Sequence, residues 1–212
     1  MPNNKDIYEF MSKLRNSGRI MTGLSRMEKL KNIFMKYASS NGSFVECGVA
    51  MGGCLALMKY VADQKKIFGF DSFEGMPNQT IEDGGVGNKY IGYKCSGDNG
   101  EKSVSETFDI MNLSMQNILL IKGWFNETLS KNKHLVGDIS VLRVDGDWYE
   151  SVKCCLDVLY SSVIIGGTII IDDYDTFPGC KKAVNEFRTN NKITSKIEFF
   201  EGNSEICWIK EV

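Results

Sequence analysis

The segment from residue 43 to residue 71 constrains the fold more than any other part of the chain. Residues 43–49 (SFVECGV) form a short apolar run with a glycine near its end, which predicts a buried strand. Gly52 and Gly53 then open a helical pattern over 54–62, and residues 66–71 (KIFGFD) predict a second strand. A strand, a glycine-bearing turn, a helix and a strand make a βαβ unit, which requires a parallel sheet.

The same alternation continues towards the C-terminus and predicts one α/β domain over residues 1–212. Further strands are expected at 117–121, 139–145 and 168–173, and helices at 5–39 (broken near Ser17-Gly18), 104–112, 126–133, 149–163 and 179–190. Gly166 and Gly167 are expected to end the helix 149–163, since glycine is favoured just past a helix C-terminus. The tail predicts two antiparallel strands, 196–200 and 205–210.

Two segments lie outside this alternation. Residues 1–40 carry amphipathic helical spacing and are expected to form an N-terminal helical lid and dimer surface, which predicts a homodimer or higher homo-oligomer. Residues 77–102 are rich in glycine and poor in aliphatic side chains. A polar loop of this length is either a functional lid or a disordered insert. Composition weighs these two interpretations equally.

Composition and charge exclude several classes of protein. The 212 residues suit a single core, and a net charge of −2 without a basic region argues against nucleic-acid binding. No apolar run approaches the ~20 residues that span a bilayer, and the first residues do not read as a secretory signal. The seven cysteines form no C-x-x-C pair, and with one histidine they make a zinc site improbable. Reduced cysteines predict a cytoplasmic protein.

Acidic residues stand at the carboxyl ends of four predicted strands. Ligands bind at these ends in parallel α/β sheets. Glu46 and Gly48 belong to the end of the first strand, and Asp71 ends the second. Asp145-Gly146-Asp147 follows the fourth strand, and Asp172-Asp173 ends the fifth. The sequence therefore predicts a binding site at this edge of the sheet.

The turn after the first strand indicates a ligand that carries a positive charge. Its glycines let a ligand approach the backbone, although a tightly packed turn would also need them. Glu46 would repel a pyrophosphate, so a ligand with an amino-acid ammonium group is favoured. Asp71 is placed to accept hydrogen bonds from ribose hydroxyls. Phe73 and Trp124 lie at strand ends, where an adenine could stack.

The acids of the fourth and fifth strands predict a metal site. Asp145, Asp172 and Asp173 would lie within a few ångströms of one another on adjacent strands and would repel unless a cation joined them. Mg²⁺ prefers such oxygen ligands. The alternative is that these aspartates cap helices, as Asp147 would cap a helix near Tyr149. His134, the only histidine, is a weaker catalytic candidate.

Five stretches of the chain resemble the macrocin O-methyltransferase family, sugar O-methyltransferases of the class I fold that use S-adenosylmethionine. The likeness runs from about residue 19 to 190, and the loop 77–102 departs from it. The stretches are MTGLSRM (21–27), FVECGV (44–49) with Gly52-Gly53, FDSFEGMP (70–77), KGWF (122–125) with Thr128-Leu129, and RVDGDWYES (143–151) with residues 166–174.

This resemblance implies a Rossmann-like, three-layer αβα fold whose seven-stranded, mostly parallel sheet has an antiparallel last strand. It implies S-adenosylmethionine and Mg²⁺ as cofactors, with Asp145, Asp172 and Asp173 as metal ligands. The base would be Asp145 or Asp147, with His134 behind them. The implied cofactor-binding residues are Thr22, Glu46, Gly48, Val49, Gly52, Gly53, Asp71, Ser72, Phe73, Gly123, Trp124 and Asp145.

Three functional hypotheses follow. The first is a Mg²⁺-dependent methyl transfer from S-adenosylmethionine to a hydroxyl of a sugar or glycosylated metabolite. The second places the same metal chemistry on a catechol-like diol. The third is a cofactor-binding partner subunit without transfer activity, against which the intact set of acids argues.

Overall fold

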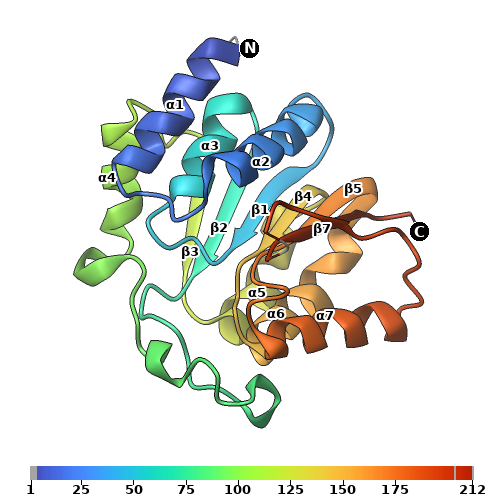
Figure 1. Ribbon diagram of the computed structural model, residues 1–212. Coiled ribbons are helices and arrows are strands. Elements are labelled where there is room, and N and C mark those ends of the chain that lie inside the picture. Colours follow the sequence, from blue (N-terminus) through green and yellow to red (C-terminus); the bar gives the residue numbers. More distant parts are fainter. Residues whose placement is uncertain (1–3, 203, 212) are drawn as a thin grey trace.

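The computed structural model describes residues 4–202 and 204–211, and its centre is a seven-stranded sheet with helices on both faces (Figure 1). The strands follow the order β3-β2-β1-β4-β5-β7-β6. Their bounds are β1 Ser43–Cys47, β2 Ile67–Asp71, β3 Ile118–Lys122, β4 Ile139–Val144, β5 Val163–Ile171, β6 Glu198–Phe199 and β7 Ile206–Ile209. Strands β1 to β5 are parallel, β7 is antiparallel to β5, and β6 is antiparallel to β7. The predicted fold class is confirmed.

The helices divide between the two faces because alternate strand residues point to opposite sides of the sheet. Val141 of β4 packs in one core and its neighbour Leu142 in the other. The first core holds residues of α1 Asn4–Asn16, α2 Leu24–Tyr37, α3 Gly53–Val61 and α4 Lys102–Ile110. The second holds residues of α5 Phe125–Val136, α6 Tyr149–Leu159 and α7 Pro178–Asn190.

The predicted helix 149–163 is confirmed over Tyr149–Leu159, but its predicted end, with Gly166 and Gly167 just past it, is wrong. Helix α6 ends at Leu159, a short 3₁₀ turn covers Tyr160–Ser162, and β5 begins at Val163. The pairing with β4 then jumps from Val163 opposite Ile139 to Thr168 opposite Val141. The two glycines therefore lie in an irregular segment of β5, where the pairing register shifts and Gly166 adopts a φ of 80°.

The glycine-rich segment 77–102 is folded onto the protein. It contains three short 3₁₀ turns, Ile81–Asp83, Asn88–Tyr90 and Gly97–Asn99. The indole nitrogen of Trp148 donates a hydrogen bond to the carbonyl of Pro77 at 3.0 Å. Asp83 is buried. These contacts favour the interpretation of the loop as part of a functional site over that of a disordered insert.

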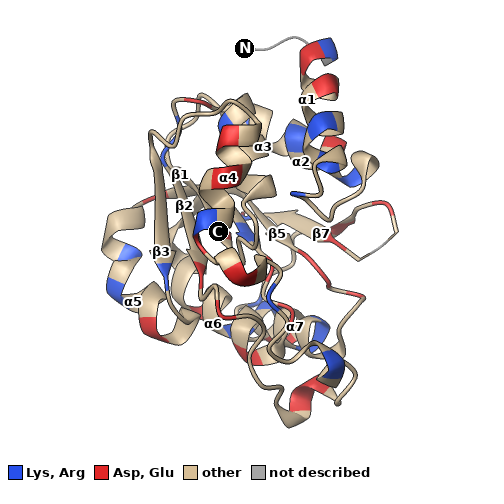
Figure 2. Ribbon diagram, turned by 90° about the vertical axis from the view of Figure 1, so that its left-hand side faces the viewer, with Lys and Arg blue, Asp and Glu red and all other residues tan. Residues whose placement is uncertain are grey.

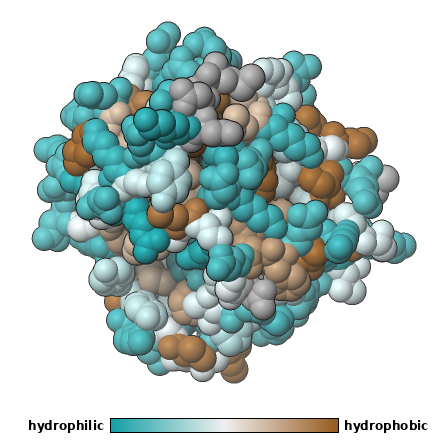
Figure 3. All heavy atoms as spheres, turned by 45° about the horizontal axis from the view of Figure 1, so that its top comes forward, coloured by the Kyte–Doolittle hydropathy of each residue, from teal (hydrophilic) through white to brown (hydrophobic). Residues whose placement is uncertain are grey.

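The surface carries charges of both signs and few large apolar groups. Lys and Arg are mixed with Asp and Glu along the helices (Figure 2). Hydrophilic side chains dominate the face shown in Figure 3, where apolar residues occur in small groups. Within the described part of the chain, no helix has the length and apolar character needed to cross a membrane.

Candidate active site

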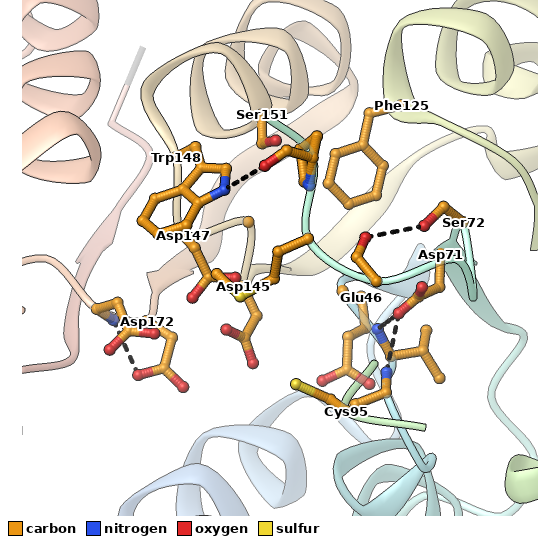
Figure 4. A pocket seen from close by; sticks show the side chains of 18 of the residues that line it. Glu46, Asp71, Ser72, Cys95, Phe125, Asp145, Asp147, Trp148, Ser151 and Asp172 are labelled. Atoms are coloured by element: carbon orange, nitrogen blue, oxygen red, sulfur yellow. Dashed lines mark hydrogen bonds between the residues drawn. The ribbon is translucent and has the colours of Figure 1, made fainter. Parts of the chain in front are cut away.

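A cavity of about 950 Å³ opens at the carboxyl ends of β1, β2, β4 and β5, where the sequence predicts a site. The turns after these strands form its floor. Residues 19–22 between α1 and α2 form part of its wall, and so does the loop 77–102 through Pro77, Tyr93 and Cys95. Figure 4 shows Asp145 and Asp147 towards one side of this space and Asp71 towards the other.

The turn after β1 is packed against the turn after β4. A Cβ atom on Gly48, whose φ is 92°, would lie 1.9 Å from the carbonyl oxygen of Asp145. A Cβ atom on Gly53 would lie 2.3 Å from the carbonyl oxygen of Arg19. Both glycines therefore have a packing reason and also line the cavity, together with Val49. Gly52 is absent from the described residues that line it.

Asp71 is fixed by backbone amides at the end of β2. Its Oδ2 accepts hydrogen bonds from the amides of Val49 at 2.7 Å and Ala50 at 2.9 Å, and its Oδ1 accepts one from Phe73 at 2.7 Å. Both lone pairs of Oδ2 are used by these amides, whereas Oδ1 has a second lone pair with which it can still accept from a ligand. Three backbone amides therefore fix the orientation of this carboxylate at the edge of the cavity.

Glu46 is a buried acid with one unused oxygen. Its side chain is 1% exposed, and Oε1 accepts a hydrogen bond from Arg143 at 2.9 Å. Among the described residues, none is hydrogen-bonded to Oε2. Burial raises the pKa of Glu46 to about 7, against the opposing effect of Arg143. An unpaired buried acceptor is costly, so a ligand ammonium group would fit this wall of the cavity.

A group of carboxylates capable of binding a metal lies at the other side of the cavity. One oxygen from each of Asp145, Asp147 and Asp173 lies within 4.8 Å of the others. Burial, and then repulsion by Asp173, raises the pKa of Asp147 well above its ordinary value. Burial, and then Asp172, raises that of Asp173. Three crowded hard oxygen donors suit a divalent cation such as Mg²⁺.

Asp172 differs from the predicted ligand set. Its Oδ2 accepts a hydrogen bond from Arg143 at 2.5 Å and its Oδ1 one from Arg26 at 3.4 Å, so it stands outside the group just described. Asp173 instead has a φ of 57°, and its side chain interacts with that of Asp147. Asp147 takes the place in the group that the sequence assigned to Asp172.

The structure does not support two other predictions, a catalytic role for His134 and a helix-capping role for Asp147. His134 is exposed on the last turn of α5 and is not among the described residues that line the cavity. Asp147 does not cap α6, because the amide of Tyr149 donates to Asp83 Oδ1 at 2.8 Å. Of the remaining predicted cofactor residues, Thr22, Ser72, Phe73 and Trp124 line the cavity and Gly123 does not.

Arg143 is a site residue that the sequence arguments passed over, although it stands in a quoted motif. It is 2% exposed, next to the last residue of β4, and pairs with Glu46, Asp145, Asp172 and Glu205. The only signal in the sequence is a charge inside an otherwise apolar strand. Asp83, Arg26 and Glu205 were also missed, because each reaches its partner from a distant element.

Comparison with sequence families and curated relatives gives the following matches. The family model described as Macrocin-O-methyltransferase (TylF) matches residues 12–208. Demethyldecarbamoylnovobiocin O-methyltransferase of Streptomyces niveus is 31% identical over 205 residues, covering 89% of this chain and 77% of the relative. Mycinamicin III 3''-O-methyltransferase of Micromonospora griseorubida is 27% identical over 210 residues, covering 89% and 80%.

Solved structures share this architecture. The O-methyltransferase NovP superposes with a TM-score of 0.81 at 28% identity, covering 92% of this chain and 83% of that one. The MycE methyltransferase, whose structure is a complex with Mg and SAH, gives a TM-score of 0.63 at 16% identity. It covers 97% of this chain and 55% of that one, and at this identity the likeness concerns the fold alone.

Proposed function

Because this chain belongs to the macrocin O-methyltransferase family and is an S-adenosylmethionine-dependent O-methyltransferase, we propose that it methylates a sugar hydroxyl with the help of Mg²⁺. The acceptor is a sugar or a glycosylated metabolite, as the names of the curated relatives suggest. One observation carries the proposal: a single cavity holds Glu46 and Asp71 together with the crowded group Asp145, Asp147 and Asp173.

The methyl donor occupies the side of the cavity formed by the turns after β1 and β2. Asp71 accepts a hydrogen bond from a ribose hydroxyl through Oδ1, and the free oxygen of Glu46 accepts one from the ammonium group. Phe73 and Trp124 flank the adenine. The backbone at Gly48 and Val49 and the side chains of Thr22 and Ser72 complete this side.

The acceptor hydroxyl occupies the other side, beside the carboxylates. We assign Asp145 and Asp173 as metal ligands, because Mg²⁺ in enzymes commonly uses only one or two carboxylates. When bound there, the cation lowers the pKa of a coordinated hydroxyl. Asp147, whose carboxylate lies within 4.8 Å of the other two, takes up the hydroxyl proton. Asp172 remains paired with Arg143 and Arg26 and is not assigned as a ligand.

The protein's main contribution is orientation. A methyl sulfonium is already electrophilic, so the reaction needs the acceptor oxygen in line with the methyl carbon and the sulfur. The loop 77–102 closes the cavity next to Asp147 through Trp148 and so frames the acceptor and excludes water. We expect this work to take place in the cytoplasm, as the seven unbridged cysteines favour.

A transfer assay across glycosides, nucleotide sugars and catechols, with and without EDTA, tests this function. We expect methylation of a glycoside, loss of turnover with EDTA and recovery with Mg²⁺. Methylation of catechols alone would replace the proposed acceptor class. Cofactor binding without turnover on any acceptor would point to a partner subunit.

Matched Asp→Asn variants test the ligand assignment by Mn²⁺ binding without substrate. Asp145→Asn and Asp173→Asn are expected to weaken Mn²⁺ binding tenfold or more, because each removes a charged ligand. Asp172→Asn is expected to change it less. Loss of Mn²⁺ binding in Asp172→Asn, together with its retention in Asp147→Asn, would return Asp172 to the ligand set that the sequence predicts.

A further inference from the structure

Arg143 stands between the two sides of the cavity. It is the next-to-last residue of β4, directly opposite Glu46 of β1 in the strand pairing, and its side chain is 2% exposed. The neighbouring strand on its other side is β5, which leads into Asp172. The residue is thus buried at the centre of the edge where cofactor and acceptor meet.

One guanidinium group contacts four carboxylates. Nη1 donates to Glu46 Oε1 and to Asp145 Oδ2, each at 2.9 Å. Nη2 donates to Asp172 Oδ2 at 2.5 Å, and Nε donates to Glu205 Oε1 at 3.3 Å. The donors of a guanidinium point in fixed directions in one plane. The relative positions of these four acids are therefore set by one rigid fork.

Three of these acids are divided between the two sides of the cavity in the proposed reaction. Glu46 serves the ammonium group of the methyl donor, while Asp145 and Asp172 lie at the acceptor side. We propose that Arg143 is a positioning residue that fixes the methyl-donor side of the cavity relative to its metal-binding side. This inference rests on the proposed function, since it needs a ligand on each side.

The physical reason is the strictness of in-line transfer. A misplacement of about 1 Å can cost roughly a hundredfold in rate. Strands β1 and β4 hold their backbones in register, but a carboxylate at a strand end can still rotate. Arg143 removes that freedom for Glu46, Asp145 and Asp172 at once. Arg26 adds a second contact to Asp172 only, at 3.4 Å.

Arg143 also stabilises the fold by neutralising buried acids, and the test must separate this role from the positioning role. Glu46 and Glu205 are buried acids, and Arg143 is the cation paired with both. Removing its charge would leave several carboxylates uncompensated and would destabilise the fold. Arg143→Lys keeps the charge but replaces the planar fork by a single ammonium group. This variant isolates geometry from charge.

Binding measurements on the full chain test the proposal without turnover. S-adenosylhomocysteine affinity is measured by calorimetry without metal, and Mn²⁺ affinity is measured without cofactor. In Arg143→Lys we expect both affinities to fall tenfold or more. We also expect kcat to fall by a larger factor than KM rises. Asp71→Asn should weaken only the first affinity, and Asp173→Asn only the second.

Arg188→Lys is the matched control. Arg188 donates to the carbonyl of Ser195 and stacks on Trp208 away from the cavity, so its loss should lower the melting temperature and leave both affinities unchanged. A folded Arg143→Lys protein that keeps both affinities, or loses only one, would overturn the positioning role. If the single variant does not fold, Arg143→Lys with Glu205→Gln removes one buried charge and is read in the same way.

The same measurements separate this inference from the proposed function. A wild-type protein that binds S-adenosylhomocysteine but not Mn²⁺ would overturn the metal part of the proposed function. Arg143 would then have no metal-binding side to hold in place relative to the methyl donor. A wild-type protein that binds both, with an Arg143→Lys variant that binds both equally well, would overturn the inference alone.

Discussion

At the scale of single residues, buried acids give the site its character. Glu46 and Glu205 are 1% and 0% exposed, and each has one oxygen without a hydrogen-bond partner among the described residues. Burial raises the pKa of both side chains to about 7, although Arg143 opposes the shift. Both groups therefore stay partly protonated near neutral pH even though each is paired with Arg143.

These two raised pKa values predict a pH dependence of stability. Between about pH 4.5 and pH 7 the folded chain keeps protons that the unfolded chain releases. Their contribution is therefore complete below about 4.5 and is lost as the pH rises through about 7. Urea unfolding from pH 5 to pH 8 should show this decline, and Glu205→Gln should make it shallower. An identical slope in wild type and variant would contradict the prediction.

Asp71 provides the second prediction at this scale. Asp71→Asn should weaken S-adenosylhomocysteine binding by about 1.5–3 kcal/mol, since a neutral amide replaces a charged acceptor. It also puts an amide donor near the backbone amides of Val49, Ala50 and Phe73. Calorimetry measures the affinity. A dissociation constant equal to that of the wild type would remove Asp71 from the ribose site.

At the scale of elements, the loop 77–102 is joined to the helices α6 and α7. Asp83 Oδ1 accepts the hydrogen bond from Tyr149 at the start of α6, and its Oδ2 accepts from the amide of Thr80 at 2.8 Å. A Cβ atom on Gly179, in the first turn of α7, would lie 1.9 Å from Asp83. One buried carboxylate therefore joins the loop, α6 and α7.

The loss of this junction should affect the acceptor side of the site. Asp83→Ala removes the capping interaction of α6 and should cost about 1–2 kcal/mol of stability. It should also raise the KM for the acceptor and leave S-adenosylhomocysteine affinity unchanged. Glu82→Gln is the control, because the exposed ion pair of Glu82 with Lys182 contributes little. Equal KM values for the acceptor in the two variants would mean that the contacts of Asp83 do not shape the acceptor side of the site.

At the scale of the whole molecule, the N-terminal helices are part of the main fold. Leu14 of α1 and Phe34 of α2 pack in the same core as Phe44 of β1 and Leu55 of α3. Arg26 of α2 also reaches Ser204 near β7 at 2.9 Å. Segment 1–40 is thus expected to fold with the sheet as one domain, while its predicted role as a dimer surface stays a prediction for light scattering.

This packing predicts a single unfolding transition. Circular dichroism reports on all helices, including α1 and α2, whereas the three tryptophans lie at 124, 148 and 208, outside the N-terminal helices. Urea curves from the two signals should coincide, as expected for one cooperative unit. A first transition seen by dichroism alone would mean that the N-terminal helices unfold separately.

The order of helices and strands, the parallel sheet and the edge at which the acids gather can all be predicted from local sequence patterns. These follow from hydrophobic periodicity and turn residues, which are local, and from the rule that parallel strands end at one edge. The glycines of β5 were misread because a glycine pair looks alike at a helix end and at an irregularity in a strand.

Only the tertiary structure decided which acids converge. Asp147 and Asp173 both have a positive φ, a backbone conformation that their turns impose, and their carboxylates lie close together. Asp172 is drawn away by Arg26 of α2 and by Arg143, and Arg143 is held in turn by Glu205. Contacts between residues so distant in the chain, like the direction of a side chain at a strand end, leave no periodic trace in the sequence.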